Sequence, residues 1–276
     1  MKKIDLHIHT TCSDGVFTPK QILEKVTNFE MDVFSITDHD NIDGFLEVKD
    51  CMPENGPELI PGVEISSNHN DKDVHILAYF FDPDNAELKK MLGNIHTGRF
   101  QRAEQILERL QKININISME RIRELAGGND LIGRPHIARA IIEAGLCRNT
   151  QDVFDKFLGE DCPGFVPKPA PSSEEVIKLI KETGGVSVLA HPYTLRSDEI
   201  LYELIELGID GMEVFYAKHN AFNTKFFNEV AITNKLIRTG GTDFHGDGID
   251  LEFFGKFFPP EEIIEDLERA RNLRRT

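Results

Sequence analysis

The sequence predicts an α/β protein built on a parallel sheet or barrel, with a helical insertion in the middle of the chain. Short β-branched runs alternate with helical runs at both ends of the sequence, which is the pattern of βα units. The alternation stops over residues 88–164, where helical patterns follow one another without a convincing strand. The length of 276 residues, with 40% hydrophobic and 28% charged side chains, is typical of a globular chain with a full core.

Seven runs are predicted to be strands because β-branched and apolar residues dominate them. They cover residues 4–9, 33–37, 59–65, 74–80, 186–190, 211–215 and 236–239. Helices are predicted between strands where a capping residue precedes apolar residues at helical spacing. Thr18 is followed by Pro19, Ser172 begins a capping box that ends at Glu175, and Ser197 precedes an acidic first turn.

The helical insertion divides the predicted fold into three segments. Residues 1–87 would form the first part of the barrel, residues 88–167 a helical cap over the substrate, and residues 168–276 the second part of the barrel. Proline residues near position 167 favour extended backbone, which suits a chain returning to the barrel.

Charge and cysteine content limit the partners and the compartment. The formal net charge of −16 argues against a basic face for duplex DNA, whose binding depends on Lys and Arg neutralising phosphates. No apolar stretch is long enough to span a membrane, and the N-terminus has no secretory pattern. The four cysteines form no C-x-x-C pair. We therefore expect a cytoplasmic protein without duplex DNA or membrane partners, and the sequence does not identify its partner proteins.

Histidines and carboxylates recur at the predicted strands. His7 and His9 lie two residues apart in the first strand, so their rings point to one face and could share a cation. An isolated H-x-H would equally suit an incidental pair in a sheet. However, all but one of the predicted strands carry or precede such residues, and catalytic groups gather at the C-terminal strand edge of parallel barrels. The other candidates are Asp14, His39, Glu64, His75, His191, Asp243 and His245. His69, His96 and His219 do not fit the pattern and are expected to be surface or capping residues.

This residue set predicts a metal centre. Imidazoles and carboxylates without paired thiolates suit Zn, Mn or Fe. Nine candidate ligands are enough for two or three divalent ions, with carboxylates as bridges. Metal ions about 3.5–4 Å apart are typical of enzymes that catalyse in-line displacement at phosphorus.

Six motifs together resemble the PHP family, the polymerase and histidinol phosphatase metallo-phosphoesterases. They are D-L-H-I-H-T-T-C-S-D-G from Asp5, I-T-D-H-D from Ile36, P-G-V-E from Pro61, V-H-I-L-A-Y from Val74, A-H-P from Ala190 and G-T-D-F-H-G from Gly241. The resemblance covers residues 1–82 and about 168–246, in family order. It implies a distorted (β/α)7 barrel with a trinuclear metal centre.

The resemblance also implies how the ligands are shared. His7, His9, Glu64 and Asp243 would bind the first metal ion, and Glu64, His75 and His191 the second. Asp14, His39 and His245 would bind the third. The family often has His where this chain has Asp14, and this difference would change which metal ion the third site prefers. Asp38 and Asp40 would then orient neighbouring ligands or act as capping residues.

The insertion resembles one branch of the family, the nucleoside 3',5'-bisphosphate phosphatases that also act as 5'-to-3' exoribonucleases on short RNA. The segment G-R-P-H-I-A-R-A from Gly133 carries this likeness. Arg134 is expected to bind phosphate through its guanidinium fork, with His136 as a substrate contact and candidate general acid. Arg99 and Arg102 are further candidate substrate contacts, although an Arg on a helix is equally often a solvated surface residue.

The sequence therefore predicts a metal-dependent phosphoesterase that uses a metal-activated hydroxide. Its expected substrates are phosphate monoesters of nucleotides and, in addition, short RNA that is shortened from the 5' end. Three alternatives stay open at this point. The barrel motifs would also fit a histidinol-phosphate phosphatase, although the helical insertion argues against it. A metal-dependent amidohydrolase uses similar barrels, but no Lys is expected at a strand end among the ligands. A metal-stabilised domain without turnover is the third.

Overall fold

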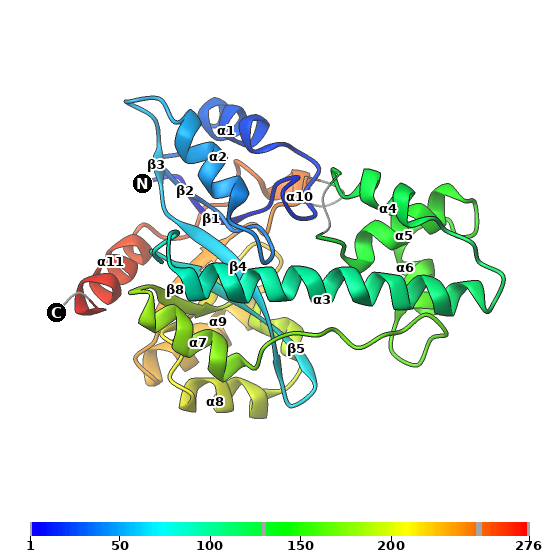
Figure 1. Ribbon diagram of the computed structural model, residues 1–276. Coiled ribbons are helices and arrows are strands. Elements are labelled where there is room, and N and C mark those ends of the chain that lie inside the picture. Colours follow the sequence, from blue (N-terminus) through cyan, green and yellow to red (C-terminus); the bar gives the residue numbers. More distant parts are fainter. Residues whose placement is uncertain (1, 129–130, 247–249, 275–276) are drawn as a thin grey trace. The chain divides into compact units, whose positions relative to one another are not determined.

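The computed structural model describes residues 2–128, 131–246 and 250–274 (Figure 1). Contacts between residues divide the chain into two compact units. The α/β unit consists of Met1–Lys90 and Pro171–Thr276, and the helical unit consists of Met91–Ala170.

Within the described residues, the strands of the α/β unit form two sheets. The first sheet has the order β1 (Ile4–Ile8), β2 (Val33–Ile36) and β3 (Glu58–Leu59), all parallel. The second has the order β4 (Gly62–His69), β5 (Lys72–Tyr79), β6 (Val186–Leu189), β7 (Gly211–Tyr216) and β8 (Ile237–Gly241). Single bridges between Ile8 and Phe244 and between His39 and Glu64 link the two sheets. The α/β class is thus confirmed, whereas no closed seven-stranded barrel is found in the described part of the chain.

The predicted parallel arrangement is wrong for β5, which pairs antiparallel with both β4 and β6. The reason is a tight hairpin: Asn70 and Asp71 both adopt positive φ, at 50° and 63°, as the two-residue turns that join antiparallel strands require. The strand predicted over residues 59–65 is also two strands, β3 and β4. Pro61 lies between them and has no N–H to donate to a sheet.

The predicted helix starts of the α/β unit are confirmed by their caps. Thr18 and Gln21 form a capping box at α1, Ser172 and Glu175 form another at α7, and the Ser197 side chain accepts a hydrogen bond from Ile200 at α8. Helix α7 packs on β4, β5 and β6, α9 on β7 and β8, and α11 on β8 (Figure 1). The helical elements are α1 (Pro19–Asn28), α2 (Asp43–Cys51), α7 (Ser173–Glu182), η2 (Pro192–Leu195), α8 (Asp198–Glu206), α9 (Ala221–Thr233), α10 (Asp250–Phe253) and α11 (Glu262–Arg274).

The described residues of the helical unit contain no strand. Helix α3 (Ala86–Gln111) begins in the α/β unit and continues into the helical unit, which also holds α4 (Met119–Leu125), α5 (Arg134–Glu143), α6 (Thr150–Val153) and the π-helical turn η1 (Phe154–Leu158). Ile106, Leu110, Ile122 and Ile141 are buried at their centre. No helix among the described residues, including the 26-residue α3, combines the length and the apolar character needed to cross a bilayer.

Candidate metal centre

The first strand places two imidazoles on one face. His7 and His9 are fully buried, and their ring centroids lie 5.1 Å apart. Leu6 and Ile8, on the other face, are buried in the hydrophobic core. The alternation expected from the sequence therefore directs both rings into one polar interior, which apolar layers surround.

Glu64 lies at the centre of this interior. Its Oε2 is 3.3 Å from Nε2 of both His7 and His9 and 3.0 Å from Nδ1 of His39. Its Oε1 is 3.0 Å from Nδ1 of His75 and 3.0 Å from Nε2 of His191. One fully buried carboxylate thus faces five imidazoles, an arrangement in which it could bridge cations bound on its two oxygens.

Three groups of side chains have ligand atoms close enough to bind a metal ion. The first is His7, His9, Glu64 and Asp243, the second is His39, Glu64 and His75, and the third is His9, Asp14, His39 and His245, with all ligand atoms of each group within 4.8 Å of one another. These groups contain eight of the nine residues that the sequence singled out. The ninth, His191, belongs to none of them, but its Nε2 lies 3.0 Å from Oε1 of Glu64. His39 and His9 each belong to two groups, so the division of ligands differs in part from the division that the family resemblance implies.

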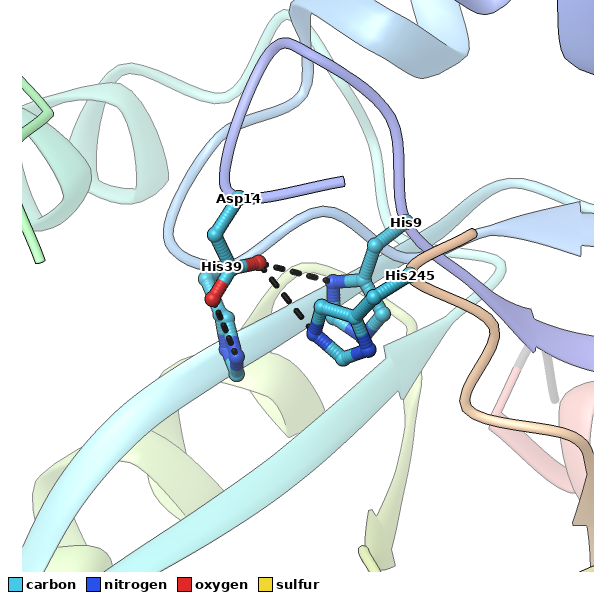
Figure 2. Close-up of side chains that lie close together, drawn as sticks. All are labelled: His9, Asp14, His39 and His245. Carbon is cyan, nitrogen blue, oxygen red and sulfur yellow. Dashed lines mark ion pairs between the residues drawn. The ribbon is translucent and has the colours of Figure 1, made fainter. Parts of the chain in front are cut away.

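The third group is built around Asp14. Figure 2 shows its carboxylate turned toward three rings, with Oδ1 3.2 Å from Nε2 of His245 and 3.8 Å from Nδ1 of His9. The other oxygen, Oδ2, lies 3.8 Å from Nε2 of His39. His9 and His245 stack with their centroids 4.1 Å apart. These distances leave Asp14 within reach of a shared cation.

His75 enters the centre because β5 runs antiparallel to its neighbours. It lies near the beginning of β5, opposite Ser66 of β4. The beginning of an antiparallel strand lies at the same edge as the ends of the parallel strands beside it. His191 reaches that edge from the end of β6, and its positive φ of 29° turns the chain there.

The buried nitrogens of His9 give a structural test of whether cations fit. Both ring nitrogens of His9 are buried without a hydrogen bond of acceptable geometry, although Nε2 lies 3.2 Å from Oδ1 of Asp243. Buried polar atoms without such a bond cost free energy unless something else satisfies them. Imidazole nitrogens that converge with carboxylate oxygens, but do not hydrogen-bond well to them, suit cation binding.

The electrostatics favour charged carboxylates at the centre. Burial raises the pKa of Glu64, but the His39, His75 and His7 rings outweigh it and hold that pKa well below its usual range. Burial also raises the pKa of Asp243, but the His245 and His7 rings outweigh it and hold that pKa well below its usual range. Burial lowers the pKa of His39 to about 4, so this ring is neutral and its lone pair is available to a cation.

Metal binding should release protons. Burial lowers the pKa of His245, but the Asp14 and Asp243 carboxylates more than reverse this and raise it to about 10. In the metal-free protein the ring is therefore protonated at neutral pH and must lose a proton to bind a cation. Affinity for Mn²⁺ should fall as the pH decreases from about 8 to about 6. Calorimetric titrations in buffers of different ionisation enthalpy would measure the released protons, and an affinity independent of pH would contradict the expectation.

Sequence reasoning missed Glu213. This fully buried side chain in the middle of β7 places Oε1 3.0 Å from Nδ1 of His7, and its Oε2 accepts a hydrogen bond from the backbone N–H of His191. A single carboxylate thus orients two candidate ligands, as supporting groups around metal sites do. The sequence signal that could have identified Glu213 is a single Glu within an otherwise apolar strand.

Replacing Glu213 with Gln should weaken metal binding without removing a candidate ligand. Partners that orient metal-bound imidazoles contribute about 10- to 100-fold to metal affinity or activity. We expect a loss in that range, measured by titration with Mn²⁺ and by phosphate release. Glu229→Gln on the outside of α9, where the side chain is 65% exposed, is the matched control. Unchanged affinity in Glu213→Gln would show that His7 needs no such support.

A lysine does lie at a strand end among the candidate ligands, which corrects the sequence expectation. Lys218 follows β7, and its Nζ is 3.4 Å from Oδ2 of Asp243 and 3.0 Å from Oδ1 of Asp250. Burial lowers its pKa, but the two carboxylates outweigh that effect and raise it above the ordinary value. A charged ammonium is not nucleophilic toward carbon dioxide. Lys218 therefore does not match the carboxylated lysine of an amidohydrolase.

The carboxylates of Asp38 and Asp40, which flank His39 in sequence, accept hydrogen bonds from segments that carry other candidate ligands. Asp38 accepts hydrogen bonds from the backbone and hydroxyl of Thr10 and from the hydroxyl of Ser13. Asp40 accepts them from the backbone and hydroxyl of Ser66. Both carboxylates thus order the segments that carry ligands.

Of the three remaining histidines, His96 is half-buried within α3, and the other two differ in environment. His69 pairs with Glu203 at 2.8 Å, as a surface residue would. His219 instead packs against Tyr193, Tyr216 and Phe227 and donates a hydrogen bond from Nδ1 to the Val214 carbonyl, so the expected surface role is wrong for it.

The predicted substrate contacts all lie in the helical unit. Arg99 and Arg102 are buried, each 8% exposed, so neither is a solvated surface residue. Arg102 donates from Nε to the Val166 carbonyl, and Arg134 lies over the Phe154 ring. His136 Nδ1 accepts the backbone N–H of Gly133 at the start of α5. This nitrogen therefore caps the helix.

The comparisons with known proteins agree on one family. The model of the PHP domain matches residues 5–158. The chain is 32% identical to the 5'-3' exoribonuclease Rnm of Escherichia coli over 266 residues, which is 94% of this chain and 90% of that protein. It is 30% identical to the 3',5'-nucleoside bisphosphate phosphatase of Chromobacterium violaceum, covering 90% of this chain and 89% of that protein. A solved structure from Bifidobacterium adolescentis, assigned provisionally as a metal-dependent phosphoesterase, matches with a TM-score of 0.86 and 31% identity over 98% of this chain and 96% of that one.

Proposed function

The chain belongs to the PHP domain family and is a metal-dependent phosphoesterase, and from this premise we propose that its substrates are nucleotides. It would remove the 3'-phosphate of nucleoside 3',5'-bisphosphates and shorten RNA from the 5' end. The two relatives above support this proposal, because one is named a 5'-3' exoribonuclease and the other a 3',5'-nucleoside bisphosphate phosphatase. They involve the same bond, because both reactions cleave between a 3'-oxygen and phosphorus.

One observation carries the proposal: Glu64 faces five imidazoles with its two oxygens. We propose that His7, His9, Glu64 and Asp243 bind one divalent ion, that Glu64, His75 and His191 bind a second, and that Asp14, His39 and His245 bind a third. Mn²⁺, Zn²⁺ or Fe²⁺ would suit these ligands. When bound, such ions supply positive charge to phosphate oxygens and lower the pKa of water toward neutrality.

The chain's own residues prepare this chemistry. Glu213 fixes the ring of His7, and the Tyr216 hydroxyl donates a 2.8 Å hydrogen bond to Oδ2 of Asp243. Lys218 offsets negative charge on that same oxygen. The remaining oxygen of Asp243, Oδ1, then faces His7 and His9. The side chains of His7 and Asp243 are thus each held in place by a second contact, which reduces the reorganisation needed during reaction.

We further propose that the helical unit supplies the contacts to substrate phosphate. Arg134 follows Gly133 at the beginning of α5, and a Cβ placed at Gly133 would lie 3.6 Å from a guanidinium nitrogen of Arg99. Arg99 therefore lies beside the residue that precedes Arg134, and a guanidinium group can bind two phosphate oxygens at once. Arg102 and His136 complete the proposed contacts, and His136 stays a candidate general acid through Nε2.

A comparison of substrates tests the proposal. Purified protein with Mn²⁺ should release phosphate from adenosine 3',5'-bisphosphate with a higher kcat/KM than from histidinol phosphate, and should release mononucleotides from 5'-phosphorylated short RNA. A higher kcat/KM for histidinol phosphate would contradict the proposal that nucleotides are the substrates. Hydrolysis of cyclic amides without phosphate release would overturn the phosphoesterase itself.

A further inference from the structure

A cavity outside the candidate metal centre lies at the same edge of the second sheet. Its volume is about 300 Å³, and it is bounded by the segment after β6 and by the first turns of α8 and α9. We call it the aromatic pocket and define it by Tyr193, Arg196, Asp198, Phe222, Asn223 and Phe226. It lies wholly within the α/β unit. Ligands of α/β proteins bind at the C-terminal ends of strands, which is where this pocket opens.

Aromatic rings connect the pocket with the metal centre. Tyr193 is two residues after His191, and its ring stacks on Tyr216 at 5.7 Å with an interplanar angle of 29°. Tyr216 lies 6.0 Å from the His191 ring and donates its hydroxyl to Asp243. The pocket is therefore separated from two candidate metal ligands by a single tyrosine.

The pocket combines exposed aromatic faces with an unengaged cation. Phe222 is 75% exposed and Tyr193 38% exposed, so their rings are accessible to a ligand. Arg196 adopts a left-handed conformation with φ 51°. Its guanidinium forms no hydrogen bond or ion pair with any residue that the structure describes, and the same is true of the Asn223 side-chain amide. Arg196 is exposed, so its guanidinium is available to an anionic ligand.

We propose that the aromatic pocket binds a nucleobase of the substrate, with Arg196 contacting a phosphate of the same nucleotide. This inference rests on the nucleotide activity proposed above and adds where the base binds. An aromatic face for stacking, an amide for the base edge and a guanidinium for phosphate together match a nucleotide. The Asp198 carboxylate on the pocket wall can accept a hydrogen bond from an amino or hydroxyl group of that nucleotide.

Phe222 offers the cleanest test because it is the most exposed ring of the pocket. The experiment compares kcat/KM for adenosine 3',5'-bisphosphate with kcat/KM for glycerol 2-phosphate, which has no base. In Phe222→Ala the ratio of the two should fall about 5- to 150-fold, the factor expected for losing one base stack, mainly through KM. Phe222→Tyr should keep the ratio. Tyr202→Ala, which removes a 46% exposed ring of α8 outside the pocket, is the matched control.

A measurement of nucleotide binding tests the pocket independently of the hydrolysis rate. The fluorescence of 2-aminopurine riboside 3',5'-bisphosphate should be quenched by the wild-type protein and by Phe222→Tyr, but much less by Phe222→Ala, because stacking quenches this base. Arg196→Gln should weaken the same binding and reduce its salt dependence. An unchanged substrate ratio, or equal quenching by all variants, would overturn the pocket. Absence of hydrolysis in the wild-type protein would instead refute the proposed function, with quenching still deciding on the pocket.

Discussion

Replacing Glu64 with Gln should reduce kcat/KM for nucleotide hydrolysis by at least about 10³-fold, because bound cations contribute several kcal/mol of transition-state stabilisation. The amide has the volume of the carboxylate, so the core should remain packed. It lacks the charge and the second acceptor oxygen that face five imidazoles. We therefore expect the purified variant to contain less metal than the wild-type protein, measured by elemental analysis beside the rate.

The matched control is Glu203→Gln, which removes a carboxylate that also contacts an imidazole, His69, away from the metal centre. This control should retain its metal and its activity. A Glu64→Gln protein that is folded and keeps its rate within about tenfold would contradict the bridging role assigned to this side chain.

Removing divalent ions with a chelator should abolish activity to a similar extent and lower the melting temperature by roughly 5–15 °C, the shift expected when a ligand present far above its Kd is lost. The physical cause is that ionised Glu64, Asp14 and Asp243 then stay buried without cations. Adding back Mn²⁺, Zn²⁺ or Fe²⁺ separately, followed by metal analysis, should restore activity with two or three ions per chain.

Gel filtration after chelation separates loss of metal from loss of fold, because an aggregated protein would elute early and could not be reactivated. Full activity in a preparation shown to be free of metal would refute the metal-dependent mechanism. Restoration with a single ion per chain would refute only the proposed number of ions.

The candidate ligands could be found from the sequence because their positions follow a simple geometric rule. His7 and His9 alternate along one strand, and His191 and Asp243 follow the ends of two others. Ends of parallel strands meet at one edge, so residues far apart in sequence converge there. His75 obeys the same rule only because β5 is antiparallel, which the sequence reading did not recognise.

Other features depend on tertiary packing that no local pattern encodes. Glu213 sits among apolar residues of β7, so its spacing resembles that of a core position, and only its contact with His7 shows its role. Lys218 lies two residues beyond the strand end, where the path of the loop decides which carboxylates it meets. Asn70 and Asp71 are turn-forming residues, and their tight turn makes β5 antiparallel, whereas the alternation along the whole chain predicted a parallel sheet.

The bridge between Ile8 and Phe244 joins the beginning of the chain to a segment close to its end. Because Asp243 and His245 flank this bridge, a ribosome-bound nascent chain has an incomplete set of metal-binding side chains until those last residues emerge. Pairing across so large a sequence separation forms slowly. We therefore expect metal binding to require synthesis of the chain through His245, because a product that ends before Asp243 would lack two of the candidate ligands.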